Sequence, residues 1–130
     1  MLTQYQINAF KDTLDRRFQS VREEIRQALL RSDEQSYIEL AGRVHDAEEA
    51  SVADLLVDVS LADIDRHVEE VRDIDAALSR IATGRFGTCC DCGEAIEVAR
   101  LEAYPTARRC TPCQAAYEQR RPVPSHSTSL

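Results

Sequence analysis

The stretch Phe86 to Cys113, FGTCCDCGEAIEVARLEAYPTARRCTPC, contains two pairs of cysteines, each with two residues between its members. Cys89 and Cys92 form the first pair, and Cys110 and Cys113 form the second. Two intervening residues allow a tight backbone turn, or knuckle, to aim both thiolates at one ion, and a tetrahedral set of four thiolates favours zinc. The sequence therefore predicts that these four cysteines bind one zinc ion.

The predicted zinc ion has a structural role. The segment around the cysteines contains few large apolar side chains, so burial alone cannot hold its shape, and metal binding would supply the missing stability. Four protein ligands leave no open coordination position for water or substrate, which argues against a catalytic metal. Cys90 is left over, and we interpret it as a bystander, with a substitute ligand and an oxidation-sensitive thiol as the alternatives.

The residues before the cysteines carry two series of apolar side chains at helical spacing. The first series runs from Ile7 to Leu29 in steps of three or four, which predicts an amphipathic helix. Thr3, followed three residues later by Gln6, predicts a capping box at the start of this helix. The members of the first series are Ile7, Phe10, Leu14, Phe18, Val21, Ile25 and Leu29.

The second apolar series runs from Val52 to Ile81 and predicts a return helix that ends at Gly84. Between the two series, Gly42 is suited to end the first helix in a left-handed turn. We therefore expect two long antiparallel helices that meet at a hairpin tip near residues 42–51.

These patterns predict an all-α fold with a small zinc module. Residues 1–84 are expected to form a two-helix antiparallel coiled-coil hairpin, and residues 85–121 a four-cysteine zinc-finger module with a C-terminal helix. The composition of residues 122–130, PVPSHSTSL, predicts a disordered tail. We expect the protein to be a monomer.

The charge balance and the motif content exclude several classes of function. The formal net charge is -7, and residues 1–84 hold 18 acidic against 10 basic side chains, which argues against sequence-specific binding to bare DNA. No stretch has the ~20 apolar residues of a membrane span, and MLTQYQINAF lacks the features of a signal peptide, so we expect a cytoplasmic protein without membrane contacts. No catalytic constellation can be assembled, so we do not expect an enzyme.

The cysteine segment resembles the signature of the DksA/TraR family of C4-type zinc-finger regulators of RNA polymerase. The resemblance implies that RNA polymerase is the partner and that the hairpin enters its secondary channel, through which nucleotides reach the active site. It also implies that the zinc module stays at the rim of the channel. The matching elements are Phe86-Gly87, the first cysteine pair, Gly93, Ile96, the run Arg100-Leu101-Glu102-Ala103, Pro105-Thr106 and the second cysteine pair.

The same resemblance assigns the hairpin tip to Asp46, Glu49 and Ser51. The family pattern at these positions is Asp, Asp and Ala, so only Asp46 is identical. An acidic tip near a magnesium-containing active centre would modulate initiation through local charge and hydrogen bonding. The alternative is that Asp46 and Glu49 only cap the second helix.

The resemblance also predicts a departure from the family. Basic side chains of the family help to bind the alarmone guanosine tetraphosphate (ppGpp) at the polymerase rim, and the corresponding residues here are Asp73, Tyr104 and Gln114. None of them carries the positive charge that a pyrophosphate prefers, so we expect no ppGpp response. Two other functions stay open, namely a zinc-stabilised coiled-coil adaptor that docks on another protein and a thiol redox switch acting through Cys90.

Overall fold

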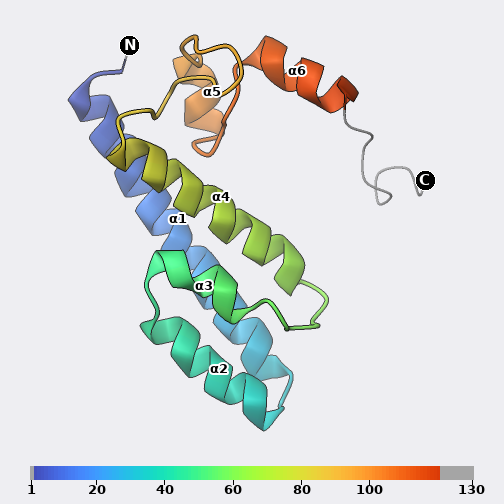
Figure 1. Cartoon of the computed structure of the whole chain (residues 1–130). Coiled ribbons are helices and arrows are strands. Elements are labelled where there is room, and N and C mark those ends of the chain that lie inside the picture. Colours follow the sequence, from blue (N-terminus) through green and yellow to red (C-terminus); the bar gives the residue numbers. More distant parts are fainter. Residues whose placement is uncertain (1, 121–130) are drawn as a thin grey trace.

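The protein is described by a computed structural model that covers residues 2–120, and the predicted tail at 122–130 lies outside the described residues. The long helices α1 and α4 run antiparallel along each other, while α2 packs on α1 and α3 packs on α4 (Figure 1). The predicted all-α fold with a long helix pair is confirmed. The helices of the described part are α1 (Gln4–Arg31), α2 (Gln35–Asp46), α3 (Glu49–Leu55), α4 (Ile64–Ala82), α5 (Val98–Ala103) and α6 (Thr111–Arg120).

Helix α1 begins where the sequence predicts. The hydroxyl of Thr3 accepts a hydrogen bond from the backbone N–H of Gln6 at 3.1 Å, and the Gln6 side chain accepts one from the Thr3 N–H at 2.8 Å. This capping box satisfies two of the backbone donors that the first turn of a helix leaves open. All the predicted apolar residues of the helix except Ile7 are buried.

The first helix is shorter than the sequence predicts, so the expectation of one continuous arm up to Gly42 is wrong. Helix α1 ends at Arg31, the chain reverses through residues 32–34, and α2 runs back along α1 (Figure 1). The Ser32 hydroxyl donates to the Leu29 carbonyl at 2.8 Å, and Asp33 adopts the left-handed conformation with φ 64°. Local side-chain bonding of this kind competes with helix continuation.

The return arm is also interrupted. Helix α3 ends at Leu55, and residues 56–63 form a loop before α4 begins at Ile64. Leu56 and Val59 in this loop are buried, whereas Val57 between them is exposed. The apolar residues whose spacing predicted one continuous helix thus lie partly in a loop, where Leu56 and Val59 cover the core.

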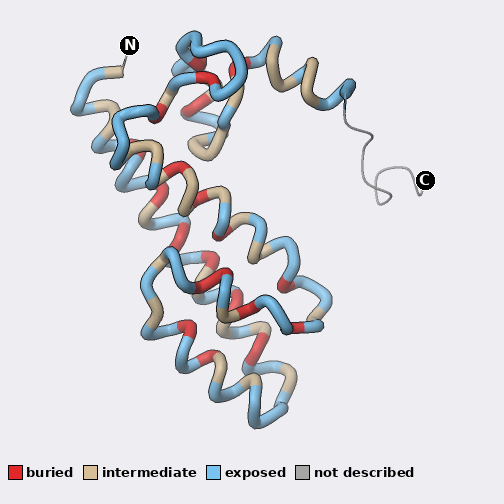
Figure 2. The backbone as a smooth tube through the Cα atoms, viewed as in Figure 1, coloured by how far each residue is buried: buried red, intermediate tan, exposed pale blue. Residues whose placement is uncertain are grey.

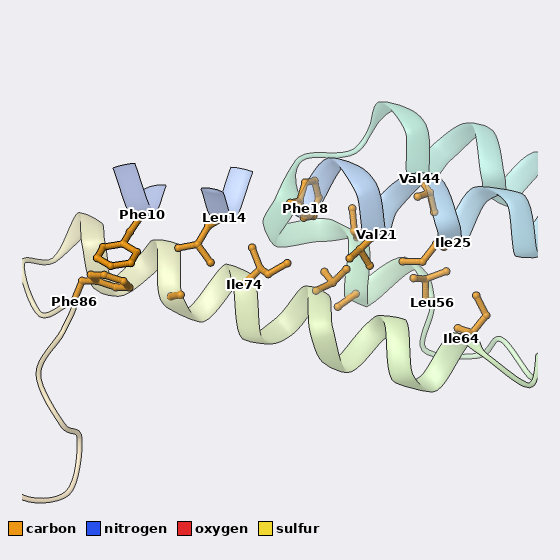
Figure 3. Close-up of a cluster of buried hydrophobic side chains, with 14 of the residues drawn as sticks. Phe10, Leu14, Phe18, Val21, Ile25, Val44, Leu56, Ile64, Ile74 and Phe86 are labelled. Carbon is orange, nitrogen blue, oxygen red and sulfur yellow. The ribbon is translucent and has the colours of Figure 1, made fainter. Parts of the chain in front are cut away.

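One continuous hydrophobic core joins the helices. Buried residues face the space where α1 to α4 meet, and exposed residues cover the outside (Figure 2). Phe18, Val21 and Ile25 of α1 pack in the centre of this core (Figure 3). Among the described residues, no helix combines the length and the apolarity needed to cross a bilayer.

The cysteine segment packs against the N-terminal end of α1 and follows the C-terminal end of α4. The rings of Phe10 and Phe86 lie 5.5 Å apart between centroids, and both side chains are buried (Figure 3). Gly87 has φ 86°, and a β-carbon at this position would lie 2.7 Å from the side chain of Leu2. The beginning of the chain and the zinc module are therefore packed closely against each other.

Candidate zinc centre and hairpin residues

The structure brings the four predicted cysteines together. The sulfur atoms of Cys89, Cys92, Cys110 and Cys113 all lie within 4.8 Å of one another, and those of Cys92 and Cys110 are 3.8 Å apart. Zinc–sulfur bonds of about 2.3 Å place tetrahedral thiolates at such separations. The fifth cysteine, Cys90, is exposed and does not belong to this set.

The first knuckle is held by its own backbone. The N–H of Gly93 donates to the carbonyl of Cys89 at 3.0 Å, and the Cys89 N–H donates to the carbonyl of Glu94 at 2.8 Å. Gly93 has φ 78°, a conformation that a side chain would oppose. The backbone N–H of Asp91 donates to the Cys89 sulfur at 3.4 Å, as expected for a thiolate that accepts from the turn around it.

The second knuckle leads directly into α6. Cys110 precedes the helix and Cys113 lies in its first turn, where the Gln114 N–H donates to the Cys110 carbonyl at 2.9 Å. The guanidinium of Arg100, on α5, donates to the carbonyl of Arg109 at 2.9 Å and so ties α5 to the residue before Cys110. Hydrogen bonds therefore support each knuckle in addition to its cysteine ligands.

The surroundings of the cluster shift the pKa of Cys89 and that of Cys113 in opposite directions. Burial opposes ionisation of Cys89, but hydrogen bonds from the backbone of Cys92, Cys110 and Asp91 lower its pKa to about 6. Hydrogen bonds with Cys110 and Cys92 raise the pKa of Cys113, since its proton is shared with them. Four thiolates so close together need a cation, and the donor set fits one structural Zn²⁺.

The residues assigned to the tip lie at the junction of α2 and α3 and not at the outermost turn. This junction lies beside α1, since Arg22 of α1 donates to the Ala47 carbonyl at 3.0 Å, whereas the turn at 32–34 is farthest from the zinc module (Figure 1). The expected hairpin tip near residues 42–51 is therefore a junction between α2 and α3 and not the end of two long helices. Its physical cause is the early reversal of the chain, which lets Val44 of α2 become buried against α1.

The three tip residues differ in environment. The Asp46 side chain is 83% exposed and lies 3.1 Å from the ring of His45. One carboxylate oxygen of Glu49 is buried without a hydrogen-bond partner, and burial, followed by the charge of Asp15, raises the pKa of this group. Ser51 is exposed. Capping by Asp46 is not observed, because α3 begins at Glu49 without a side-chain cap.

The residues at the positions linked to ppGpp face different surroundings. Asp73 accepts a hydrogen bond from Arg108 at 3.2 Å, and Tyr104 is exposed beneath the guanidinium of Arg100. Asp73 and Tyr104 line the same groove between α1, α4 and α5, whereas Gln114 bonds Glu118 within α6.

Sequence reasoning missed a cluster of arginines next to the first knuckle. They come from the end of α4, the turn after it and the residues before Cys110. The available signal was the charge balance of residues 85–130, which is slightly positive in a protein of net charge -7. The cluster consists of Arg80, Arg85, Arg108 and Arg109.

Comparison with known proteins agrees with this geometry. The sequence profile of the prokaryotic dksA/traR C4-type zinc finger matches residues 84–119. A protein named RNA polymerase-binding transcription factor DksA from Haemophilus influenzae is 40% identical over 62 residues, which cover 48% of this chain and 43% of that protein. Its namesake from Salmonella typhimurium is 26% identical over 121 residues, which cover 92% and 76%. The chain therefore spans less than half the length of the Haemophilus influenzae relative.

The likeness extends to the fold. The structure of transcription factor DksA2 from Pseudomonas aeruginosa covers 90% of this chain with a TM-score of 0.62 and 27% identity, and 86% of that chain is matched. The fold and the cysteine centre define a C4 zinc-finger protein built on a helical hairpin. Residues 84–119 match the DksA/TraR C4-type zinc finger family, and the fold of the chain is similar to that of DksA2.

Proposed function

We propose that this chain is a transcription regulator that binds RNA polymerase and catalyses no reaction itself. The observation that carries the proposal is a family zinc module fixed to a long antiparallel helix pair. Relatives that match this module are named RNA polymerase-binding transcription factors. A rigid base with a projecting rod suits a protein that reaches into a channel.

The proposed action is electrostatic and mechanical. The end of the rod would enter the secondary channel, and the zinc module with α6 would remain at its rim. Residues 1–84 carry 18 acidic against 10 basic side chains, so the entering part brings negative charge towards a magnesium-containing centre. Such charge alters nucleotide loading or the stability of the open complex without breaking a bond in any substrate.

We propose Asp46, Glu49 and Ser51 as the contact residues of the regulator, because the family register assigns them. Asp46 is the strongest of the three, since its carboxylate is exposed. Asp33 and Glu34 at the outermost turn are also accessible to solvent and provide a matched comparison of equal charge. Replacing Asp46 together with Glu49, or Asp33 together with Glu34, therefore distinguishes a role of the family positions from a role of the outermost turn.

Binding is tested with purified components. The zinc-loaded chain is expected to co-purify with core RNA polymerase, and removal of zinc with a chelator is expected to abolish binding because the base unfolds. If the zinc-loaded chain does not bind the polymerase but binds another protein, it is an adaptor with the family fold and the proposal is wrong.

The contact residues are tested in reconstituted transcription. Asp46→Asn with Glu49→Gln is expected to retain polymerase binding and to lose the effect on promoter activity. Asp33→Asn with Glu34→Gln is the control and is expected to retain both. If only the control pair loses the effect, the regulatory contact lies at the outermost turn, and the family positions are not the contact residues.

The proposed regulator does not respond to ppGpp. Asp73 already pairs with Arg108, and Tyr104 and Gln114 carry no charge, so a pyrophosphate finds no free cation at these positions. Transcription is measured with and without ppGpp, using a polymerase on which ppGpp can bind only at the rim, where this chain sits. We expect the effect of the chain on transcription to be the same in both conditions. An increase in the chain's effect with ppGpp would refute this part.

A thiol redox switch at Cys90 is disfavoured by its environment. Partial burial, together with Asp91 and Cys89, raises the pKa of the Cys90 thiol, although Arg109 opposes this. The thiolate is the reactive form, so a raised pKa slows oxidation near neutral pH.

A further inference from the structure

A cavity with a cationic lining lies between the end of α4 and the first cysteine knuckle. Its volume is about 530 Å³, which falls in the range of small-ligand sites. It is lined by Arg80, Arg85, Arg108 and Arg109, and no carboxylate is among its lining residues. In a protein with 23 acidic and 16 basic residues, such a cluster is a local inversion of the overall charge.

The four guanidinium groups are not equally neutralised. Arg108 pairs with Asp73 at 3.2 Å, and Arg109 pairs with Asp91 at 2.8 Å. No ion pair of the described residues includes Arg80 or Arg85. Arg80 donates to the Thr106 carbonyl at 3.4 Å, and Arg85 to the Thr83 hydroxyl at 3.3 Å.

This arrangement has an electrostatic cost that an anion would offset. Arg80 is half-buried, and burial, followed by the positive charge of Arg108, lowers its pKa. A guanidinium nevertheless remains protonated in proteins, so the like charges persist in a partly desolvated place. Burying an unpaired charge is unfavourable unless a partner of opposite sign is supplied.

The zinc centre does not supply this partner by direct contact. Zinc with four thiolates carries a formal charge of -2, and Cys89 lines the cavity. Within residues 2–120, however, the Cys89 sulfur accepts from the backbone N–H of Asp91, and no arginine donates to a sulfur of the four cysteines. Guanidinium N–H groups in the cavity are therefore left without a sulfur acceptor from the zinc centre.

We propose that this cavity binds a small anion that bears one or two phosphate groups, with Arg80 and Arg85 as its principal ligands. The planar fork of arginine matches phosphate oxygens with two parallel hydrogen bonds. The hydroxyl groups of Ser79 and Thr88, which also line the cavity, add uncharged donors. This binding site is separate from the groove of Asp73 and Tyr104, and it does not depend on the proposed role at RNA polymerase.

The test measures binding of inorganic pyrophosphate to the zinc-loaded full chain by isothermal titration calorimetry at constant ionic strength. The expected result is saturable binding of one anion per chain. Arg85→Gln is expected to weaken binding at least about tenfold, because a hydrogen bond between charged groups is lost. Arg80→Gln should act in the same direction.

Arg72→Gln is the matched control, because Arg72 is exposed on α4 and does not line the cavity. It is expected to leave the affinity unchanged. Zinc content and circular dichroism are recorded for each variant, and Arg85, being exposed, can be replaced without loss of packing. The proposal is overturned if pyrophosphate does not bind saturably, or if Arg72→Gln weakens binding as much as Arg85→Gln.

Discussion

At the scale of single residues, the cysteine cluster is where chemistry and spacing agree most closely. Backbone hydrogen bonds outweigh burial and lower the pKa of Cys89, whereas hydrogen bonds with the thiols of Cys110 and Cys92 raise the pKa of Cys113. The C-x-x-C spacing sufficed to select the four residues, since a knuckle has few alternative geometries. Spacing could not select the arginines around them, because they come from three separate segments.

Replacing one of the clustered cysteines should remove zinc, and replacing the fifth should not. Cys92→Ser leaves three thiolates, and we expect a large loss of zinc affinity with unfolding of the module, because binding energy is folding energy in such sites. Cys90→Ser is expected to retain one zinc per chain. Metal analysis of both purified variants checks this. The assignment would be contradicted if Cys90→Ser lost zinc while Cys92→Ser kept it.

Glu49 predicts a pH dependence of stability. Burial raises its pKa in the folded protein above the ordinary value of 4.5, so the folded state binds this proton more tightly than the unfolded state. The contribution to stability is present below the unfolded pKa and is lost as pH rises through the folded pKa. Glu49→Gln should therefore be more stable than wild type at pH 7.

The advantage of Glu49→Gln should shrink as the pH falls towards the ordinary pKa of a glutamate, measured by urea unfolding. Glu48→Gln, at a neighbouring position, is the control and corrects for zinc loss in acid. An advantage of the same size at every pH would show that the Glu49 charge is not its cause.

Phe10 tests the contact between the helices and the zinc module. Its ring packs on Phe86 and is 8% exposed, so Phe10→Ala should cost about 3–5 kcal/mol of unfolding free energy. Tyr5→Ala, at a side chain that is 84% exposed on the same helix, should change stability by less than about 0.5 kcal/mol. Chemical denaturation of the two variants measures the difference, and equal losses would contradict the packing.

At the scale of the elements, the sequence predicted the helices but not their breaks. The apolar period continues from Leu29 towards Val44 and from Val52 to Ile81, so the pattern alone favours two long helices. The breaks depend on short polar segments, such as Ser32 to Glu34, whose effect on a helix is decided by packing elsewhere. Folding α2 back on α1 buries Val44, and this tertiary gain is not visible in a local pattern.

Substitutions of Asp33 distinguish a chain reversal at residues 32–34 from one continuous helix, because the two arrangements predict stability changes of opposite sign. In the turn it has φ 64°, so Asp33→Ala should destabilise by about 1 kcal/mol, whereas Asp33→Gly should cost nothing. If one helix continued through this residue, Ala would stabilise and Gly would destabilise, by roughly 0.3–0.7 kcal/mol. Thermal or urea unfolding of both variants gives the sign.

At the scale of the whole molecule, the protein combines a metal-held base with an acidic helical rod. The core runs without interruption from Phe86 at the base to Ile64 at the start of α4, so the two parts are mechanically joined. Composition and cysteine spacing predicted both parts, because each has a strong local signal. The contact between them rests on residues that are distant in the sequence, and no local pattern predicted it.

The most direct test of the proposed role is to locate the bound chain relative to the active centre of RNA polymerase. Fe²⁺ exchanged for the catalytic magnesium generates hydroxyl radicals that cut nearby backbone. We expect cleavage of this chain within residues 32–51 and none in the zinc module. Cleavage confined to residues 84–120, or no cleavage when binding is saturated, would contradict entry of the helical rod into the channel.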